Sequence, residues 1–560
     1  MQRPRFLRSL FALFGAPWLS AARADAQNAP ADLIVTGATI HSVDDANASP
    51  EAFAVRGGRF VLVGSIAAVT KLRGAQTRVL ELSGKTVLPG LIDAHLHLTQ
   101  LGLSLHELPL FGVRSFEELI RATVAFAGAS PDRWIVGDGW DQNLWAGEAF
   151  PTHEALSAAL PDRPVALERV DGHALFVNAA AMRLAGVTKA TPDPPGGRIV
   201  RDGAGNPTGV FIDNAASLVS AVIPPPSEVQ LRRAALSGAA ECHRWGVTAI
   251  GEARTSAADL GLYRELASTG ALRLRNYTRV EDDPELISTV LSEGPVSGAY
   301  DGQLWVRGIK LFADGALGSR GAALLAPYDD DPGNVGLLRT TQAHIEEVSE
   351  RALRGGFQMS VHAIGDRGNR VVLDAYESAL RKVPAEGHRF RVEHAQVLAA
   401  ADIPRFKELQ LIASMQATHQ TSDMAWARER LGAARLEGAY AWRSMLDTGT
   451  IVANGTDAPV ERVNTLRTFH ASITRQDEAN EPPGGWYPQQ RMTRGEALKS
   501  MTIWAAYANF QEDVIGSITA GKYADFVVMD RDWMAVPPEQ IMQTAILATY
   551  FGGKVVYAAS

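Results

Sequence analysis

The apolar positions near both ends of the chain fall in short, β-branched runs separated by turn residues. DLIVTGATIHSV, EAFAVRGGRFVLVG and TRVLELSGKTVLPG follow one another near the N-terminus, and ADFVVMD and GGKVVYAAS resume the pattern at the C-terminus. Runs of this length bounded by glycine and asparagine or aspartate indicate β-strands. We therefore expect residues 27–87 and 508–560 to pair into one small β-sandwich.

The middle of the chain alternates short apolar runs with longer amphipathic segments such as TTQAHIEEVSERALRGG. This alternation is typical of α/β proteins, and eight such strands are what a (β/α)8 TIM barrel requires. We expect the barrel over residues 88–507, with a large insertion at about 105–225 after the first strand. The predicted strands lie near residues 86–94, 247–253, 272–280, 304–312, 357–363, 389–395, 411–417 and 450–456.

The first residues, MQRPRFLRSLFALFGAPWLSAARADAQ, run from arginines through an apolar stretch to small residues. That order is typical of a secretory signal peptide, here expected over residues 1–26, and it predicts a secreted or periplasmic protein. An N-terminal membrane anchor is the alternative. No later stretch has the apolar length of a spanning helix, so we expect no stable membrane insertion.

Charge and cysteine content narrow the classes of molecule that this protein is expected to bind. The net charge is −8 and no long basic block is present, which argues against a nucleic-acid partner and favours a small molecule. The single cysteine, Cys242, excludes an internal disulfide framework and a cysteine-based zinc site. A homo-oligomer is compatible with this composition.

Chemically versatile side chains recur at the ends of the predicted barrel strands, where the catalytic residues of such barrels lie. The segment GLIDAHLHL carries two histidines one residue apart, which share a face of the strand. Imidazole and carboxylate are zinc ligands, and the candidate ligands at these strand ends are more than one tetrahedral ion requires. A single histidine at a strand end is more often a hydrogen-bonded core group, but joint recurrence favours a metal site. The candidate ligands are His95, His97, Lys310, His362, His394 and Asp457.

The ordered motifs LPGLIDAHLHL, WIVGDGWDQNLW, RVDGHALFVN, GIKLFADGALGSRGAAL, VHAIGDRGN, VEHAQVL and NGTDAPV resemble the amidohydrolase superfamily, specifically the YtcJ-like group of amidohydrolase family 3 and N-substituted formamide deformylase-type proteins. The resemblance implies one or two divalent ions, with zinc the first expectation and manganese or iron accepting the same ligands. His95 and His97 would bind one ion, and His362 and His394 the second. Lys310, N6-carboxylated, would bridge them.

The same resemblance implies the reaction. A metal-bound hydroxide would hydrolyse a C–N bond of an amide-type, non-peptide small molecule, with linear amides the first expectation. Asp457 would be the catalytic residue that accepts a proton from the water and passes it to the leaving nitrogen.

Further residues are candidates for substrate contact: Trp140, Asp141, Trp145 and His173 in the insertion, Asp314 and Arg320 after the fourth strand, and His419 after the seventh. His173 and His419 would polarise a carbonyl, and Arg320 would pair with a substrate carboxylate. Alternatively, Arg320 braces a loop and the tryptophans pack the insertion. Ala417 stands where the resemblance predicts proline.

Three alternatives remain open from the sequence. The same metal barrel can host an isomerase, a lyase or a decarboxylase, because fold does not fix reaction. A mononuclear enzyme with unmodified Lys310 is also compatible with the motifs. The least favoured alternative is a catalytically silent binding or scaffold protein, since the complete ligand set is retained.

Overall fold

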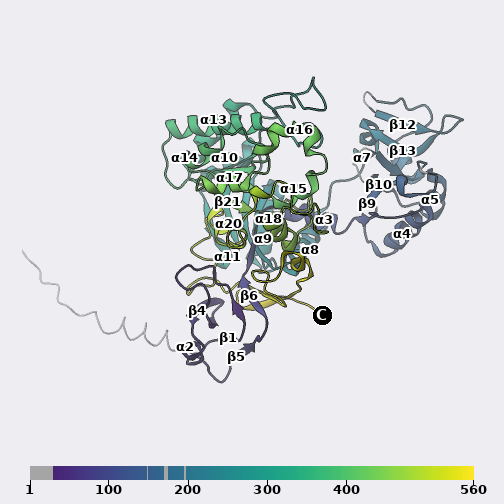
Figure 1. The fold of residues 1–560 in the computed structure, drawn as a ribbon. Coiled ribbons are helices and arrows are strands. Elements are labelled where there is room, and N and C mark those ends of the chain that lie inside the picture. The colour runs from purple at the N-terminus through teal and green to yellow at the C-terminus, as the bar shows by residue number, and fades with distance from the viewer. Residues whose placement is uncertain (1–28, 148, 170–173, 195–196) are drawn as a thin grey trace, which may run out of the picture. The chain divides into compact units, whose positions relative to one another are not determined.

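A computed structural model describes residues 29–147, 149–169, 174–194 and 197–560 (Figure 1). The contacts divide the chain into two compact units, one formed by the described residues up to His97 together with Ala239–Ser560, the other by Leu98–Gly238. The predicted signal peptide, residues 1–26, lies outside the described residues. Within the described ranges, no helix combines the length and apolar character needed to cross a bilayer.

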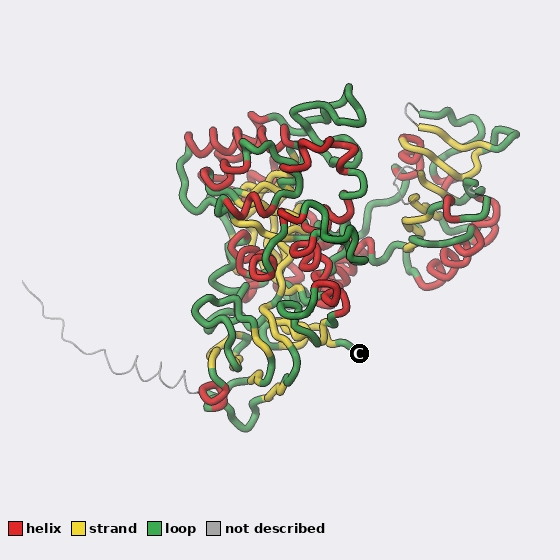
Figure 2. Tube along the Cα trace, in the orientation of Figure 1, coloured by secondary structure: helices red, strands yellow, loops and turns green. Residues whose placement is uncertain are grey.

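Eight parallel strands form the barrel of the first unit, which confirms the predicted (β/α)8 class. Each strand pairs with the next in chain order, and the short antiparallel strand β16 (Val296–Gly298) joins β17. Most positions of these strands are buried, as expected where helices cover the outside of a parallel sheet (Figure 2). The strands are β7 (Leu91–Leu96), β14 (Val247–Thr255), β15 (Arg275–Val280), β17 (Leu304–Phe312), β18 (Gln358–Ala363), β19 (Arg391–His394), β20 (Ile412–Met415) and β21 (Ile451–Asn454).

The first and last strands meet through the segment that follows β21. The backbone N–H of Asp457 donates to the carbonyl of His95 over 2.7 Å, and the N–H of His97 donates to the carbonyl of Ala458 over 2.8 Å. Asp93 accepts hydrogen bonds from the backbone and the hydroxyl of Thr456. These bonds complete the nearly closed barrel at the end where the predicted ligands lie.

Amphipathic helices cover the barrel because their apolar positions recur at helical spacing. α13 (Asp366–Lys382) buries Val372, Leu373, Tyr376 and Ala379 against the strands. Other helices on the barrel are α9 (Ala257–Ser268), α10 (Pro284–Glu293), α12 (Gln342–Gly355), α18 (Thr465–Thr474), α19 (Arg494–Ser500) and α20 (Ile503–Ala508).

Two further sheets form the predicted sandwich from both ends of the chain. One has the order β4–β3–β1–β5 and the other β2–β6–β22–β23–β24. Phe53 and Phe60 from the first sheet pack against Phe526 from the second, and Phe526 stacks on Tyr550. The strands are β1 (Leu33–Thr36), β2 (Thr39–Ile40), β3 (Ala52–Arg56), β4 (Arg59–Gly64), β5 (Arg78–Glu81), β6 (Thr86–Pro89), β22 (Phe526–Met529), β23 (Ile546–Phe551) and β24 (Lys554–Ala558).

The second unit contains the predicted insertion and has its own core. Phe116, Trp140, Trp145 and Phe176 pack together, with the two tryptophan rings stacked 6.0 Å apart. Its sheet has the order β12–β13–β11–β10–β9–β8 and is flanked by α4 (Phe116–Ala129) and α5 (His153–Ala159). The strands are β8 (Leu108–Pro109), β9 (Ile135–Trp140), β10 (Val165–Arg169), β11 (Ala174–Val177), β12 (Gly197–Arg201) and β13 (Pro207–Asp213).

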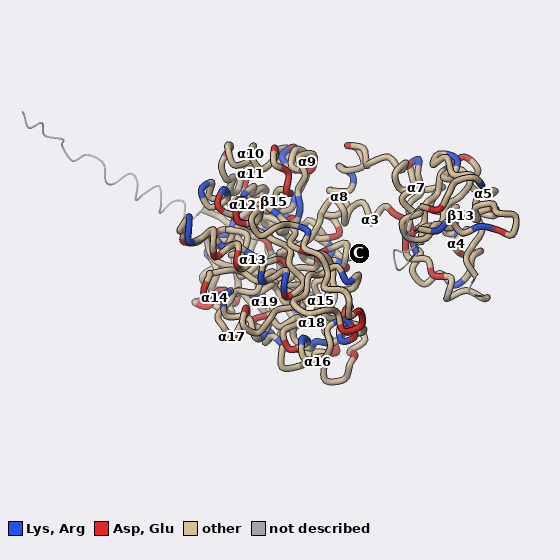
Figure 3. Tube along the Cα trace, turned by 90° about the horizontal axis from the view of Figure 1, so that it is seen from above, with Lys and Arg blue, Asp and Glu red and all other residues tan. Residues whose placement is uncertain are grey.

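Acidic and basic residues are interspersed along both units (Figure 3). In the barrel unit they include surface pairs such as Arg264 with Glu293 and Lys382 with Glu346. In the described residues, positive and negative charges are therefore mixed.

Candidate metal centre

The barrel brings together side chains from three of its strand ends around Asp457. Its Oδ1 lies 3.3 Å from Nε2 of His95 and 3.2 Å from Nε2 of His97. Ligand atoms of His95, His394 and Asp457 all lie within 4.8 Å of one another. This is the spacing that one cation could bridge, and all three residues are buried.

His95 is held by a partner that sequence reasoning did not single out. Its Nδ1 hydrogen-bonds the carboxylate of Glu393 on β19, a residue that is fully buried. Since the carboxylate accepts, Nδ1 donates in this hydrogen bond, and Nε2 lies toward Asp457. The sequence signal was a charged residue inside the buried strand segment Arg391–His394, because a charge in such a position must be paired.

His394 has the same arrangement with a neutral partner. Its Nδ1 lies 2.7 Å from Oε1 of Gln416, which accepts its hydrogen bond and leaves Nε2 turned inward. The ring lies 5.0 Å from that of His95 and 4.6 Å from that of His362, centroid to centroid. The backbone at His394 has φ +72°, a left-handed conformation that redirects the chain at the strand end.

The pKa values of these groups follow from burial. Burial lowers the pKa of His362 to about 3 and that of His394 well below its ordinary value, so both imidazoles are neutral as metal ligation requires. Burial disfavours the charged form of Asp457, but His95 and His97 hold its pKa well below the usual range.

Lys310 reaches this end of the barrel from β17, where it is 1% exposed. Its strand is in register with β18, with Lys310 opposite Ser360 and Phe312 opposite His362. Burial lowers the pKa of Lys310 to about 8, and the group interacts electrostatically with His362 and Asp457. The structure thus brings all six predicted ligands to one end of the barrel.

The residues fit a divalent cation. The buried Nε2 of His95 has no hydrogen-bond partner in the described structure, although its Nδ1 is engaged. An unpaired buried imidazole nitrogen is costly unless another group completes it. Two imidazoles and a carboxylate converging here form a donor set suited to zinc.

Only some of the residues predicted to contact substrate lie beside the histidine cluster. His419 lies in the site: its ring stacks 5.8 Å from His394, and its Nε2 is 3.7 Å from Oδ2 of Asp457. Asp314 is fully buried and accepts hydrogen bonds from the backbone of Ala323, Ile364 and Gly365, which gives it a bracing role in its loop. Its Oδ1 lies 3.5 Å from Nε2 of His362.

The other predicted contacts lie outside this cluster or in the second unit. Arg320 is bound by Asp330 through two hydrogen bonds. Trp140 is buried in the core of the second unit, where its Nε1 donates to the carbonyl of Leu167. Asp141 pairs with Arg169 in that unit, and His173 lies outside the described residues.

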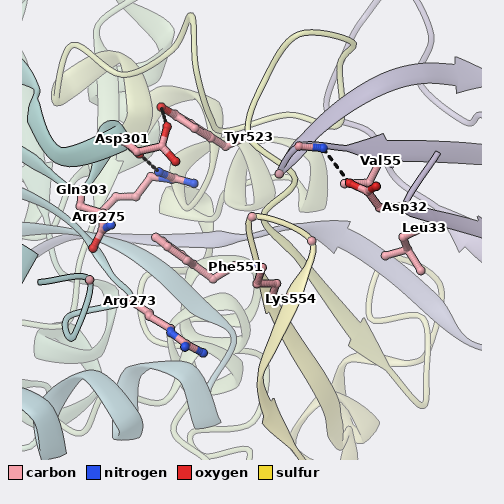
Figure 4. A pocket seen from close by; sticks show the side chains of 15 residues that line it. Asp32, Leu33, Val55, Arg273, Arg275, Asp301, Gln303, Tyr523, Phe551 and Lys554 are labelled. Atoms are coloured by element: carbon pink, nitrogen blue, oxygen red, sulfur yellow. Dashed lines mark hydrogen bonds between the residues drawn. The ribbon is translucent and has the colours of Figure 1, made fainter. Parts of the chain in front are cut away.

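A separate pocket of about 600 Å³ lies at the opposite end of the barrel, between strand starts and the sandwich (Figure 4). Its buried cation, Arg275 at the first position of β15, is already paired with Asp525. Tyr523 packs on that guanidinium and donates its hydroxyl to Asp301. The chemistry of the strand ends favours the histidine cluster over this pocket.

Comparisons with known proteins agree with the geometry. The profile described as the amidohydrolase family matches residues 78–557. Protein LONG AFTER FAR-RED 3 of Arabidopsis thaliana is 33% identical over 94% of this chain and 92% of its own length. The putative amidohydrolase YtcJ of Bacillus subtilis is 31% identical, covering 94% of this chain and 99% of its own.

Two further proteins bear on the activity. The N-substituted formamide deformylase of Arthrobacter pascens is 28% identical over 94% of this chain and 98% of its own. A crystal structure of an uncharacterized metal-dependent hydrolase from Pyrococcus horikoshii matches with a TM-score of 0.76 and 26% identity, covering 90% of this chain and 99% of that one. With its barrel, its cluster of histidines and a carboxylate, and these relatives, the chain belongs to the amidohydrolase family of metal-dependent hydrolases.

Proposed function

We propose that this protein hydrolyses an amide-type, non-peptide C–N bond of a small molecule. The observation that carries the proposal is the convergence of His95, His394 and Asp457 within 4.8 Å. Both histidines have Nδ1 engaged, by Glu393 and Gln416, so that their Nε2 atoms face the centre. A divalent ion bound there lowers the pKa of a water molecule and polarises a carbonyl group.

Asp457 is the group that moves the proton. Its carboxylate accepts a proton from the attacking water, whose oxygen bonds to the carbonyl carbon. When the C–N bond breaks, Asp457 returns that proton to the leaving nitrogen, so the acid and the amine are released with atoms balanced. His419, 3.7 Å from Oδ2 of Asp457, is positioned to donate a hydrogen bond to the substrate oxygen.

Lys310 determines whether one or two ions are held. With its pKa lowered to about 8, its amine is neutral more often than that of an exposed lysine. Only the neutral amine adds carbon dioxide, and the resulting anion would be a ligand shared with His362. We propose a carboxylated Lys310 and a binuclear zinc site, with a mononuclear site as the alternative.

The proposed substrate class rests on the hydrolytic chemistry of the site and on the name of one similar protein. The deformylase of Arthrobacter pascens bears a name that specifies N-substituted formamides, which are linear amides. A panel of N-formyl, N-acyl and cyclic amides, assayed for released amine, tests this choice. The leading expectation is turnover of linear amides.

The decisive experiment combines metal content with labelled water. Protein purified without chelator should contain about one to two zinc ions per chain, and a His95→Ala variant should contain less. Hydrolysis in ¹⁸O-labelled water should place one label in the acid product. Turnover without label would favour an isomerase, lyase or decarboxylase, and a protein that binds no divalent ion after reconstitution with bicarbonate would overturn the proposal.

We also propose export through the N-terminal segment. The support is its order of arginines, apolar residues and small residues. N-terminal sequencing of the protein recovered from periplasm or medium should begin near residue 27. An intact N-terminus in the membrane fraction would instead favour an anchor.

A further inference from the structure

We infer that Glu393 is a positioning residue for the metal centre, held by Arg279 and Arg391 in a buried clamp that fixes both the backbone and the side chain of the first ligand strand at His95. This inference rests on the proposed metal site. It concerns the buried groups inside the barrel that hold the carboxylate of Glu393 beneath the ligands.

Glu393 is the centre of the clamp. Its carboxylate accepts hydrogen bonds from Nδ1 of His95, from the hydroxyl of Ser360 and from both arginines. Arg279 lies 3.3 Å from Oε1 of Glu393, and Arg391 lies 2.5 Å from Oε1 and 3.1 Å from Oε2. Glu393 and both arginines are 0% exposed, so no solvent screens these contacts.

The same two arginines also hold the residue that precedes His95. Arg279 donates to the carbonyl of Ala94 over 3.1 Å, and Arg391 donates to it over 2.9 Å. Arg279 is further fixed by the carbonyls of Gly251 and Glu252 on β14. The carbonyl of Ala94 and the ring of His95 are therefore both bound to the same buried cluster of Glu393 and two arginines.

The geometry predicts a specific effect on the metal. A histidine that donates Nδ1–H to a carboxylate is fixed in one tautomer and becomes a more basic ligand at Nε2. His394 has the neutral amide of Gln416 in the same position. The two imidazoles thus differ in the charge of their supporting partner, and His95 should be the stronger donor of the two.

The charge of Glu393 is also needed by its neighbours. Two guanidinium groups meet one carboxylate inside the barrel, and an uncharged amide would remove the negative charge that both cations pair with. Glu393→Gln therefore changes two properties together, stability and metal affinity. The experiment must separate these effects with a variant that loses a buried ion pair elsewhere.

Asp525 offers that matched control. It is 4% exposed and forms a two-bond pair with buried Arg275. This pair lies at the strand starts, away from His95. Asp525→Asn removes a comparable buried carboxylate without touching the ligands.

The measurement is the zinc dissociation constant by competition with a chromophoric chelator, together with Tm of the metal-free proteins. We expect Glu393→Gln to weaken zinc binding about 10- to 100-fold. Asp525→Asn should lower Tm and leave zinc affinity within about 2-fold of the wild type. Equal zinc affinity in the wild type and Glu393→Gln would overturn the inference while leaving the proposed function intact.

A milder variant keeps the test decisive if Glu393→Gln does not fold. Ser360→Ala removes one donor to Glu393 and keeps every charge. It should weaken zinc binding several-fold with a small change in Tm, and unchanged affinity would count against the clamp. A wild-type protein that binds no zinc would overturn the metal site itself, which distinguishes that failure from failure of the clamp.

Discussion

The N–H of Asp457 donates to the carbonyl of His95 over 2.7 Å, so the proposed proton carrier and a proposed metal ligand are joined through their backbones. Asp457 has φ +60°, which directs its side chain back toward the two histidines of the first strand. Barrel closure and site assembly are therefore one event.

Asp457→Asn should lower kcat by about 10²- to 10⁴-fold, because the amide cannot carry the proton. Steady-state kinetics on the best amide of the panel measures the effect. Asp402→Asn, which removes a buried carboxylate paired with Arg370, is the control and should retain turnover. An Asp457→Asn enzyme within tenfold of the wild type would contradict the assigned role.

Gln416→Leu should weaken zinc binding about 10- to 100-fold, because Nδ1 of His394 loses its acceptor. The matched control is Gln358→Leu, a buried glutamine on β18 that bonds Tyr277 and Ala508 instead. Both variants should lose stability. A selective loss of zinc affinity in Gln416→Leu is expected, and equal affinity in both would argue against a supporting role for Gln416.

His243 should make stability depend on pH. Its Nε2 donates to the carbonyl of Arg273 over 2.8 Å, and burial lowers its pKa from 6.5 to about 4. Between pH 4 and pH 6.5, His243 is protonated in the unfolded chain and neutral in the folded protein. The free energy of unfolding is therefore retained above pH 6.5 and falls as the pH drops toward 4. The loss should be about 3 kcal/mol.

Urea unfolding at several pH values checks this expectation, with His243→Gln as the reference. The variant lacks the titrating group and should show a shallower decline between pH 6.5 and 4. Parallel curves would mean that protonation of His243 is not coupled to folding.

Arg320 can be tested against its ion-pair partner. If Arg320 braces the loop, Arg320→Ala and Asp330→Ala should change KM alike, and each should change stability little because the pair is partly exposed to solvent. If Arg320 binds a substrate carboxylate, only Arg320→Ala should raise KM. The bonds to Asp330 favour the first outcome.

Periodicity predicted the barrel well because each strand is a short, buried apolar run flanked by turns. All eight expected runs contain an observed strand, and the sandwich takes strands from both ends as anticipated. His95 and His97 could be paired from sequence because alternate strand residues share a face. Their imidazoles do reach the same oxygen of Asp457.

Partners between distant strands could not be predicted in this way. Glu393 precedes His394 in sequence, yet it bonds His95, and only the closed barrel places them together. Likewise, Asp314 carries no sign in sequence that it would accept three backbone hydrogen bonds instead of facing a substrate. Such contacts depend on the register and twist of several strands at once.

The pairing of β6 with β22 has a consequence for biosynthesis. Val87 lies opposite Val528, and Pro89 lies opposite Phe526, so a segment that precedes the barrel pairs with one that follows all eight barrel strands. A nascent chain can complete its barrel strands while β6 still lacks this neighbour. The second sheet can form only after all eight barrel strands have been synthesised.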